Sequence, residues 1–567
     1  MTVSLSPWDA IIDYLKSAGV RHLFGLPSDD LKIVSSLPSS GMDFILCKDQ
    51  RNAVFMAAGY ALTTNQMSVC VVGKGPALSN TLTGLLEAKN LGAPLLLLAL
   101  GTGGDKLGTR SFQEADQISL VKPLVKWAYR VEHVDRLVWA MERAAFLAIN
   151  GAPGPVYIEL PENLMDQPVP TGLQFTPPEK LTCSPSLREL DAAWAIIKTA
   201  RRPLILVGGG MKSGTPNDVI ELFAHQHGAA LFATASGRGV VDEDHELFCG
   251  VAGLYTDINL RQIWEKSDVV ITLGSRLEET ATFEWDIFLQ DTPLIQVNVN
   301  LEDFAHEYRG VKLLGDGYAA VEQWHDRLGQ KPDGEWLEMI RSCKEKAFSQ
   351  RAIYLEKLKK APGIHVPELL EMIQTEFPEN LVLLQENGLQ DMWSYFYPYF
   401  RFTHGSLSIV PSDQTSLGFG AAAALGASVA TKCPVVALVG DGAFNLFCSD
   451  FMTAVEYQIP LIYLVLNNGG YGWLQNQMNY KHLSGQSLPF VSEAAKAGIQ
   501  IPRYEFVESL AIRSKGEAKE QLQLAWQKYQ ENKLVVVEVY ADLADVHEKI
   551  SHVYGDFPLY EQQASKN

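Results

Sequence analysis

The sequence has few cysteines and none of the cysteine spacings that bind zinc or form a redox pair. Seven cysteines are spread over 567 residues, at positions 47, 70, 183, 249, 343, 433 and 448. Most of them lie in apolar segments, and no CxxC or CxxH pattern occurs. We therefore expect buried thiols in a reducing cytoplasm, not a disulfide framework or a cysteine-bound metal.

The sequence also lacks a long apolar run and a secretory leader. Its longest apolar stretch, 93–100, is far too short to cross a bilayer. The N-terminal segment MTVSLSPWDAIIDYLKSAGV predicts a capped amphipathic helix, without the basic start and apolar centre of a signal peptide. We expect a cytoplasmic protein with no membrane partner.

Positive charge is scarce as well. The formal net charge is -19, which argues against a nucleic-acid partner because phosphates would be repelled. An acidic protein can still bind a small polyanion where a metal ion and backbone N–H groups supply the local field. The length exceeds what one hydrophobic core supports, so about two to four domains are expected.

What the sequence does contain is a regular alternation of short apolar strands and helical segments. Buried strands separated by helices predict an α/β fold of mainly parallel sheets flanked by helices. Connector-like stretches at 166–186 and 328–363 divide the chain into predicted domains 1–165, 186–328 and 363–567. The middle domain carries LILVGGGMKSG, which favours a structural Rossmann-like domain over one that binds a nucleotide, because the spacing is not GxGxxG.

The first and third domains share one pattern. Each has a helix of small residues, a strand, a G-K/D-G turn, a second helix and a strand after proline. This likeness predicts the duplication of one α/β unit. The copies differ where chemistry is expected, with Lys74 in the first turn and Asp441 in the second. Lys74 is either an ordinary surface loop lysine, which we favour, or a contact for an anionic substrate.

Asp441 and Asn468 each follow a predicted strand, and one crossover joins those two strands. Ligands of parallel sheets bind beyond the carboxyl ends of the strands, so the two side chains are expected to lie close together. The glycines beside Asp441 let backbone N–H groups approach a ligand, and the next helix points its positive end there. Carboxylate, amide and carbonyl oxygens suit Mg²⁺, which completes its octahedron with phosphate and water. The alternative is a helix-capping Asp and a turn-forming Asn.

The segment GDG, followed by 24 residues and NN, resembles the thiamine diphosphate motif of the pyruvate oxidase and acetolactate synthase superfamily, which includes benzaldehyde lyase. The resemblance implies that Asp441, Asn468 and the carbonyl of Gly470 bind Mg²⁺. It also implies that the N–H groups of Gly442 and Ala443 bind the diphosphate.

The resemblance extends over nearly the whole chain, through the segments HLFGLPSDDL, GPALSN, GTRSFQEAD, ENGLQDMW and TSLGFGAAAALGA. It implies that Leu417 bends the cofactor, that the carbonyl of Thr415 accepts from its amino group, and that Gln113 faces its reactive carbon. The implied cofactor-binding residues are Pro27, Gln50, Pro76, Asn80, Gly388, Gln390, Thr415, Leu417, Gly440, Asp441, Gly442, Ala443, Asn468, Gly470 and Tyr471. In this family the cofactor spans two subunits, so a homodimer or homotetramer is expected, without FAD.

One position departs from the family. Its members activate the cofactor with a glutamate that protonates the pyrimidine nitrogen N1′, and the matching residue here is Gln50. Glutamine cannot supply a proton, although its amide can donate a hydrogen bond. Three interpretations remain: an enzyme limited by another step, a non-catalytic cofactor-binding partner subunit, or an acid supplied by Asp49 or by a shifted register. Against the last, neighbouring residues of a strand point to opposite faces.

A second departure concerns the loop after the first predicted strand. Asp29 stands where some lyases have a substrate-facing histidine, and it either relays protons or caps the following helix. Since no obvious acid protonates the intermediate, a carboligase or lyase acting on 2-oxo acids, aldehydes or acyloins is favoured. A simple 2-oxo acid decarboxylase is the alternative.

Overall fold

The fold is taken from a computed structural model of the chain. It describes residues 5–27, 32–38, 40–169, 172–214, 218–282, 291–327, 329–386, 388–480, 488, 490–542 and 545–547. Asp29, one of the predicted catalytic residues, lies outside these ranges. Within them no helix is both long and apolar enough to cross a membrane, and no disulfide bond links the cysteines.

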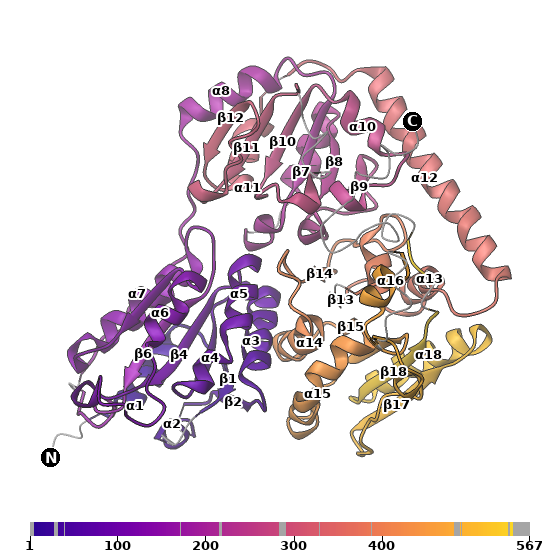
Figure 1. Ribbon diagram of the computed structural model, residues 1–567. Helices are drawn as coiled ribbons and strands as arrows, with labels where there is room; N and C mark the ends of the chain where they lie inside the picture. The colour runs from indigo at the N-terminus through magenta and orange to yellow at the C-terminus, as the bar shows by residue number, and fades with distance from the viewer. Residues whose placement is uncertain are drawn as a thin grey trace. The chain divides into compact units, whose positions relative to one another are not determined.

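Three six-stranded sheets, all parallel in their pairing, confirm the predicted fold class (Figure 1). The first contains β1 (His22–Leu26), β2 (Asp43–Leu46), β3 (Ser68–Val72), β4 (Leu95–Gly101), β5 (Trp127–Arg130) and β6 (Val156–Pro161). The second contains β7 (Pro203–Val207), β8 (Ala230–Ala233), β9 (Phe248–Val251), β10 (Val269–Leu273), β11 (Leu294–Asn298) and β12 (Gly310–Leu314). The third contains β13 (Val382–Gln385), β14 (Leu407–Ile409), β15 (Val435–Gly440), β16 (Ile462–Asn467), β17 (Val507–Ile512) and β18 (Leu534–Tyr540).

The strand orders agree with the duplication that the sequence pattern predicts. The first sheet has the order β2-β1-β3-β4-β6-β5, and the third has the equivalent order β14-β13-β15-β16-β18-β17. The second sheet has the order β12-β11-β10-β7-β8-β9, which is the Rossmann order when counted from its first strand. The buried apolar runs of these strands form the cores.

Helices separate the strands in each part of the chain. Those of the first part are α1 (Pro7–Ser17), α2 (Lys32–Ser36), α3 (Gln50–Thr64), α4 (Pro76–Ser79), α5 (Leu82–Leu91), α6 (Gln117–Val121) and α7 (Leu137–Ile149). Those of the second are α8 (Leu187–Ile197), α9 (Val219–His227), α10 (Arg261–Lys266), α11 (Gly317–His325) and the long connector α12 (Gly334–Lys360). Those of the third are α13 (Val366–Glu376), α14 (Phe419–Ala430), α15 (Asp441–Glu456), α16 (Gly472–Tyr480), α17 (Glu493–Lys496) and α18 (Ala518–Gln530).

The described residues group into two compact units. One is drawn from 1–181, 414–432 and 446–459, and the other from 182–413, 433–445 and 460–567. The first unit therefore includes α14 and the later turns of α15. The second contains the middle and third sheets together with the first residues of α15, where the predicted metal ligand Asp441 lies.

Within the first unit, α3 and α14 pack backbone against backbone. A Cβ added to Gly426 would lie 1.8 Å from the carbonyl oxygen of Met56, and one added to Gly59 would lie 2.1 Å from that of Ala423. Both neighbours are helix backbone, which cannot move away cheaply. The runs of small residues in these two helices are explained by this close approach.

We expect Gly426→Ala to lower the free energy of unfolding by about 3 kcal/mol, because the added methyl group overpacks two helices. Gly334→Ala is the matched control, since a Cβ at the start of α12 meets nothing within 4 Å. That change should be neutral or stabilising by about 0.5 kcal/mol. Urea titration followed by circular dichroism measures both, and equal midpoints would contradict the packing argument.

Candidate functional site

The carboxyl ends of β15 and β16 bring Asp441 and Asn468 together. These strands are neighbours in the third sheet, with Gly440 paired to Leu466. Asp441 directly follows β15 as the first residue of α15, and Asn468 directly follows β16. Burial raises the pKa of the Asp441 carboxyl to about 6, although the backbone N–H groups of Asn468 and Gly442 act in the opposite direction. The proximity inferred from the strand order is thus present.

Both side chains carry a buried oxygen that lacks a partner. Asp441 is 2% exposed and Asn468 is 8% exposed. Asp441 Oδ1 and Asn468 Oδ1 accept no hydrogen bond from the described part of the chain. Leaving a buried acceptor unsatisfied costs about 1–3 kcal/mol, and more for a charged group. The arrangement therefore suits a bound cation that would take both oxygens as ligands.

The asparagine pair divides into one structural and one open residue. Asn467 Oδ1 accepts from the N–H of Gly469 at 2.9 Å, and Asn467 Nδ2 donates to Glu538 Oε1 at 2.6 Å. These bonds hold the turn after β16. Asn468 is left with a free oxygen. The turn-forming alternative considered from the sequence thus describes Asn467, whereas Asn468 is the open residue.

Gln390 fixes the orientation of Asn468. Asn468 Nδ2 donates to Gln390 Oε1 at 2.8 Å, so the amide nitrogen of Asn468 is engaged and its oxygen points elsewhere. Gln390 Nε2 in turn donates to the carbonyl of Asp542. Both ends of the Gln390 amide are therefore occupied within the protein. The cofactor contact that the sequence predicts for Gln390 stays a prediction, and in the structure its side chain holds the amide of Asn468.

Glycines line the other side of this site. A Cβ added to Gly442 would lie 3.1 Å from the ring of Tyr471 and 3.3 Å from the carbonyl oxygen of Gly470. Gly470 has a φ of 140°, and the N–H of Tyr471 donates to the carbonyl of Phe490 at 2.8 Å, which holds this loop. The carbonyl of Gly470 consequently lies beside the turn that carries Asp441.

The start of α15 presents the N–H groups of Gly442 and Ala443, which an α-helix leaves without intrahelical partners. Such a terminus attracts anions. Gly440, by contrast, has open space where a Cβ would be added. Protein atoms therefore account for a glycine at Gly442, whereas the approach of a ligand to Gly440 stays a prediction.

Gly388 and Asp391 lie in the segment that follows β13, the strand next to β15. A Cβ added to Gly388 would lie 2.6 Å from Asp391 Oδ1, so glycine makes room for this carboxylate. Asp391 is 1% exposed, and burial raises the pKa of its carboxyl to about 7, against the lowering effect of backbone N–H groups including that of Gly440. The Asp391 carboxylate thus packs against the backbone turn that precedes Asp441.

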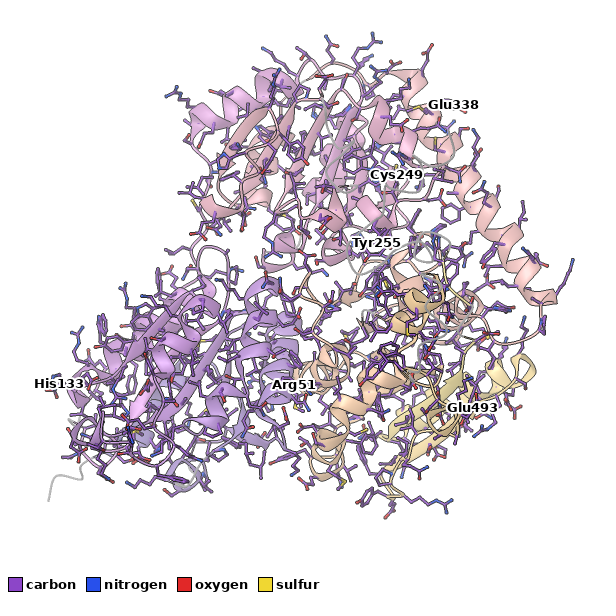
Figure 2. The ribbon with its side chains drawn as sticks, in the orientation of Figure 1. Arg51, His133, Cys249, Tyr255, Glu338 and Glu493 are labelled. Carbon is purple, nitrogen blue, oxygen red and sulfur yellow. The ribbon has the colours of Figure 1, made fainter. Side chains whose placement is uncertain are left out.

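The first unit holds the predicted pyrimidine-side residues. Gln50 is the first residue of α3, and Asp49 is its N-cap, accepting from the N–H groups of Arg51 and Asn52. Asn80 Nδ2 donates to Gln50 Oε1 at 2.9 Å and reaches Asp49 Oδ2 at 3.3 Å. Arg51, labelled in Figure 2, follows in the first helical turn.

This placement overturns one argument made from the sequence. Asp49 and Gln50 stand at a helix start, not on a strand, so they do not point to opposite faces. Both side chains turn toward Asn80. The prediction that Asp49 points away from Gln50 is therefore wrong. Asp49 Oδ1 is nevertheless engaged as the helix cap, at 2.8 Å from Arg51 N and 3.1 Å from Asn52 N.

Gln113 lies in an exposed loop that packs on the turn before Pro76. Its φ is 57°, and a Cβ added to Gly75 would lie 2.6 Å from its carbonyl oxygen. The carboxylate of Glu114 accepts from the N–H groups of Gly108 and Ser111 and so closes the loop. A shallow pocket of about 400 Å³ is lined by Gly108, Arg110, Ser111, Gln113 and Glu114.

Gln117 was not singled out from the sequence. Its Oε1 accepts from the N–H of Gly75 at 2.7 Å, and its Nε2 donates to the carbonyl of Leu100 at 2.8 Å. It thus ties the turn after β3 to the end of β4. Gln117 is 3% exposed, and its role is recognisable only once the fold is known.

Lys74 is buried, and it forms an ion pair with Glu162 at 2.5 Å. The surface lysine favoured from the sequence is therefore wrong at this position.

Pro27 follows β1 and is half-buried. Thr415 has a φ of 46°, a left-handed conformation that non-glycine residues rarely adopt. Leu417 is 37% exposed, so this large apolar side chain is presented at the surface of the first unit.

Comparisons with known proteins agree with this geometry. Three family models match successive parts of the chain: the thiamine pyrophosphate enzyme N-terminal TPP binding domain over 8–120, the central domain over 190–324, and the C-terminal TPP binding domain over 387–539. The third match contains the carboxyl edge described above, and the first contains Gln50 and Asn80.

Similar curated proteins span nearly the same length. The acetolactate synthase large subunit of Buchnera aphidicola is 23% identical over 565 residues, covering 97% of this chain and 96% of that protein. The probable acetolactate synthase large subunit of Methanocaldococcus jannaschii is 26% identical, covering 91% and 89%. Acetolactate synthase isozyme 2 large subunit of Escherichia coli is 25% identical, covering 82% and 83%. The chain therefore belongs to the acetolactate synthase-like superfamily of thiamine diphosphate-dependent enzymes.

Proposed function

We propose that the chain is a Mg²⁺-dependent carboligase or lyase that makes or breaks a C–C bond beside the carbonyl of 2-oxo acids or acyloins. The observation that carries this proposal concerns one buried oxygen each of Asp441 and Asn468, at adjacent strand ends and at the start of α15. Neither oxygen accepts a hydrogen bond from the residues that the structure describes. Bound thiamine diphosphate supplies a nucleophilic carbon and an electron sink for this reaction.

The residues present fit the metal and the diphosphate. Asp441 Oδ1, Asn468 Oδ1 and the carbonyl of Gly470 would hold Mg²⁺, whose preference for oxygen ligands they match. The N–H groups of Gly442 and Ala443 would receive the diphosphate at the positive end of α15. Gly442 keeps that approach open, since a side chain there would meet Tyr471 and Gly470.

Gln50 would face N1′ of the pyrimidine as a hydrogen-bond donor. Because its Oε1 already accepts from Asn80, the Nε2 group is the end of the amide that would donate to the cofactor. A neutral amide can orient an acceptor nitrogen but cannot transfer a proton to it. We propose that Asn80 selects this orientation, and that the chain works without the carboxylate its relatives use.

The carboligase is favoured over a simple 2-oxo acid decarboxylase. Gln113 is the polar side chain predicted to face the reacting carbon, and it donates hydrogen bonds without supplying a proton at neutral pH. The similar proteins are named acetolactate synthases, which supports ligation. Asp29 is retained as a candidate proton relay on the substrate side.

Gln390→Ala tests the metal half of the proposal. The substitution frees the Asn468 amide to rotate, so the affinity for Mg²⁺ in the presence of thiamine diphosphate should fall by about 10- to 100-fold. Gln523→Ala is the control, because the exposed Gln523 donates from Nε2 to Glu376 Oε2 at 2.8 Å, away from the predicted ligands. Titration calorimetry measures both variants. Unchanged affinity in Gln390→Ala would contradict the positioning role.

The reaction itself is tested with a panel of 2-oxo acids, thiamine diphosphate and Mg²⁺, with and without an aldehyde acceptor. The proposal predicts CO₂ release together with an acyloin where an aldehyde is the acceptor, or a 2-hydroxy-3-oxo acid where a second 2-oxo acid is the acceptor. Release of a free aldehyde as the sole product would instead identify a decarboxylase. Absence of CO₂ from every acid, with cleavage of added acyloins, would identify a lyase.

The family resemblance also supports proposals for the oligomeric state, the cellular location and the flavin requirement. We propose a homodimer or homotetramer whose subunits share each cofactor, located in the cytoplasm.

We also propose that FAD is not required. The glycines after β7 have a structural reason, because the turn is a short 3₁₀ helix (Gly209–Ser213) and Gly208 packs against the backbone of Gly274. Sedimentation and the visible spectrum of the purified protein test these points; a yellow, flavin-containing protein would contradict the second.

A further inference from the structure

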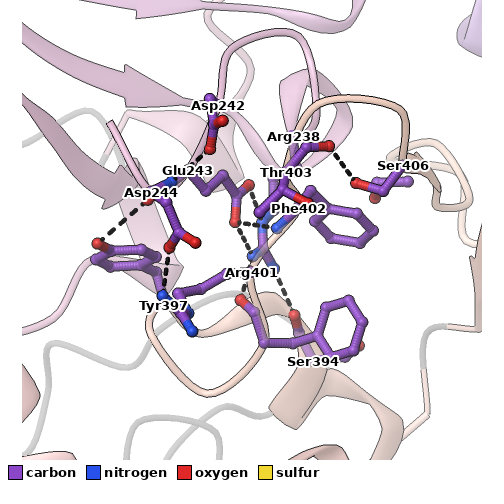
Figure 3. A network of polar contacts seen from close by, with 12 residues as sticks. Arg238, Asp242, Glu243, Asp244, Ser394, Tyr397, Arg401, Phe402, Thr403 and Ser406 are labelled. Carbon is purple, nitrogen blue, oxygen red and sulfur yellow. Dashed lines mark hydrogen bonds and ion pairs between the residues drawn. The ribbon is translucent and has the colours of Figure 1, made fainter. Parts of the chain in front are cut away.

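A fully buried ion pair lies in the second unit, in the segment that joins β8 to β9 of the middle sheet. Arg238 and Glu243 are both 0% exposed, and their side chains pair in two places, Nε to Oε1 at 2.8 Å and Nη2 to Oε2 at 2.5 Å. Figure 3 shows this pair at the centre of a polar network. Burying two charges costs desolvation energy, so a buried ion pair need not stabilise the fold. The other hydrogen bonds of the pair therefore indicate its role.

Those remaining contacts reach one segment of the third domain. Arg238 Nη1 donates to the carbonyl of Ser394 at 2.5 Å, and Nη2 donates to the carbonyl of Phe400 at 2.6 Å. Glu243 Oε2 accepts from the N–H of Phe402 at 3.0 Å, and the guanidinium lies 4.8 Å from the centre of the Phe402 ring. One buried side chain of the middle domain thus clamps the segment 394–402.

The clamped segment continues directly into the cation site. Ser394 belongs to the short 3₁₀ helix Asp391–Tyr395, which Gln390 precedes as N-cap. Ser394 Oγ donates to Gln385 Oε1 at 2.7 Å, tying this helix to the end of β13. Gln390 in turn accepts from Asn468. A short chain of contacts therefore joins the Arg238 guanidinium to Gln390. Gln390 in turn orients Asn468, a predicted metal ligand.

We propose that Arg238 is a positioning residue for the cation and diphosphate site. By holding the carbonyls of Ser394 and Phe400, it keeps the segment in the place where Gln390 meets Asn468. The middle domain then contributes to cofactor binding as a clamp on the third domain. This inference rests on the proposed function, since it concerns the same Mg²⁺ site.

The test uses the full chain and the double variant Arg238→Met with Glu243→Leu. Removing both charges together avoids leaving one buried and unpaired. The variant should fold, yet its affinity for Mg²⁺ in the presence of thiamine diphosphate should fall by about 10-fold or more. The control is Arg401→Ala, which removes the exposed pair with Asp244 between the same two segments. That control should keep the wild-type affinity for Mg²⁺.

Thermal unfolding of the metal-free proteins accompanies the titration, so that a loss of affinity is separated from a loss of structure. If the double variant does not fold, Arg238→Lys replaces it, because lysine keeps the charge but cannot donate to both carbonyls and Glu243. Wild-type Mg²⁺ affinity in a folded variant overturns the inference alone. Failure of the wild-type protein to bind thiamine diphosphate with Mg²⁺ overturns the proposed function, and this inference with it.

Discussion

Replacing Asp441 by alanine should weaken Mg²⁺ binding by more than about 100-fold and remove catalysis. Asp441 supplies the only carboxylate among the three proposed ligands, and losing a ligand costs more than the 10- to 100-fold typical of a residue that merely supports one. Titration of Mg²⁺ or Mn²⁺ into the protein with thiamine diphosphate measures the change. Retained Mg²⁺-dependent binding in Asp441→Ala would contradict the assignment of this carboxylate.

The control for this variant is a carboxylate on the same helix. Glu456 lies in the last turn of α15, where it pairs with Lys48 at 2.6 Å and is partly exposed. Glu456→Ala removes one acidic group from α15 without touching the proposed ligands. Because exposed pairs contribute about 0–1 kcal/mol, this variant should fold, bind Mg²⁺ and turn over like the wild type.

Metal-free Asp441→Asn should be more stable than the wild type at neutral pH, by about 3 kcal/mol. The folded pKa of about 6 lies above the value of 3.8 expected when unfolded, so ionisation at neutral pH opposes folding. The gain should shrink as the pH falls through 6 and vanish below about 4, where both states are protonated. Urea unfolding in EDTA at several pH values measures it. A variant that is less stable at neutral pH would contradict this reading of the carboxylate.

Gln50→Glu is expected to have the second large effect. A glutamate at this position can hold and deliver a proton to N1′, whereas the Gln50 amide can only donate a hydrogen bond. Positioned acid–base groups contribute about 10²- to 10⁴-fold, so exchange of the cofactor C2 proton with solvent should accelerate within that range. Rapid-quench exchange in heavy water, read by NMR, measures this rate directly.

The cofactor affinity and the turnover of Gln50→Glu show how a faster C2 proton exchange is to be interpreted. Affinity for thiamine diphosphate should change by less than about threefold, because glutamate and glutamine have nearly the same shape. Turnover should stay near the wild-type value if a later step is limiting, even when exchange is faster. Gln50→Ala is the companion variant. If Gln50→Glu and Gln50→Ala exchange the C2 proton at the same rate, Gln50 does not face N1′.

The sequence predicts the carboxyl edge of the third sheet well, for a simple physical reason. Parallel strands joined by one crossover have their ends at the same edge, so Asp441 and Asn468 are brought together by topology alone. The equivalent strand orders of the first and third sheets likewise follow from a repeated local pattern. Such features depend on residues that are close in the chain.

Contacts between residues far apart in the chain could not be predicted from the sequence. Gln390 bonds to Asn468 and to Asp542, which are 78 and 152 residues away, so its positioning role depends on three segments that only the fold assembles. The burial of Lys74 likewise depends on Glu162, 88 residues further on. These contacts leave no periodic pattern in the sequence.

The error at Gln50 has a different origin. The short apolar run before it favours a strand, but Asp49 is a good N-cap and the residues that follow form a helix of 15 residues. The helix-start signal is therefore present in the sequence, as an aspartate followed by Gln50, Arg51 and Asn52 and then by an apolar stretch. An extended strand at this position would place the side chains of Asp49 and Gln50 on opposite faces, which the helix start does not.

The most direct test of the central claim is equilibrium binding of thiamine diphosphate to the purified chain over a range of Mg²⁺ concentrations. We expect a single class of sites whose affinity for the cofactor rises with Mg²⁺ and is lost when EDTA removes the metal. The same experiment with Asn468→Ala should show little binding at any Mg²⁺ concentration below the millimolar range. Tight binding that is independent of divalent cations, or no binding at all, would contradict the account.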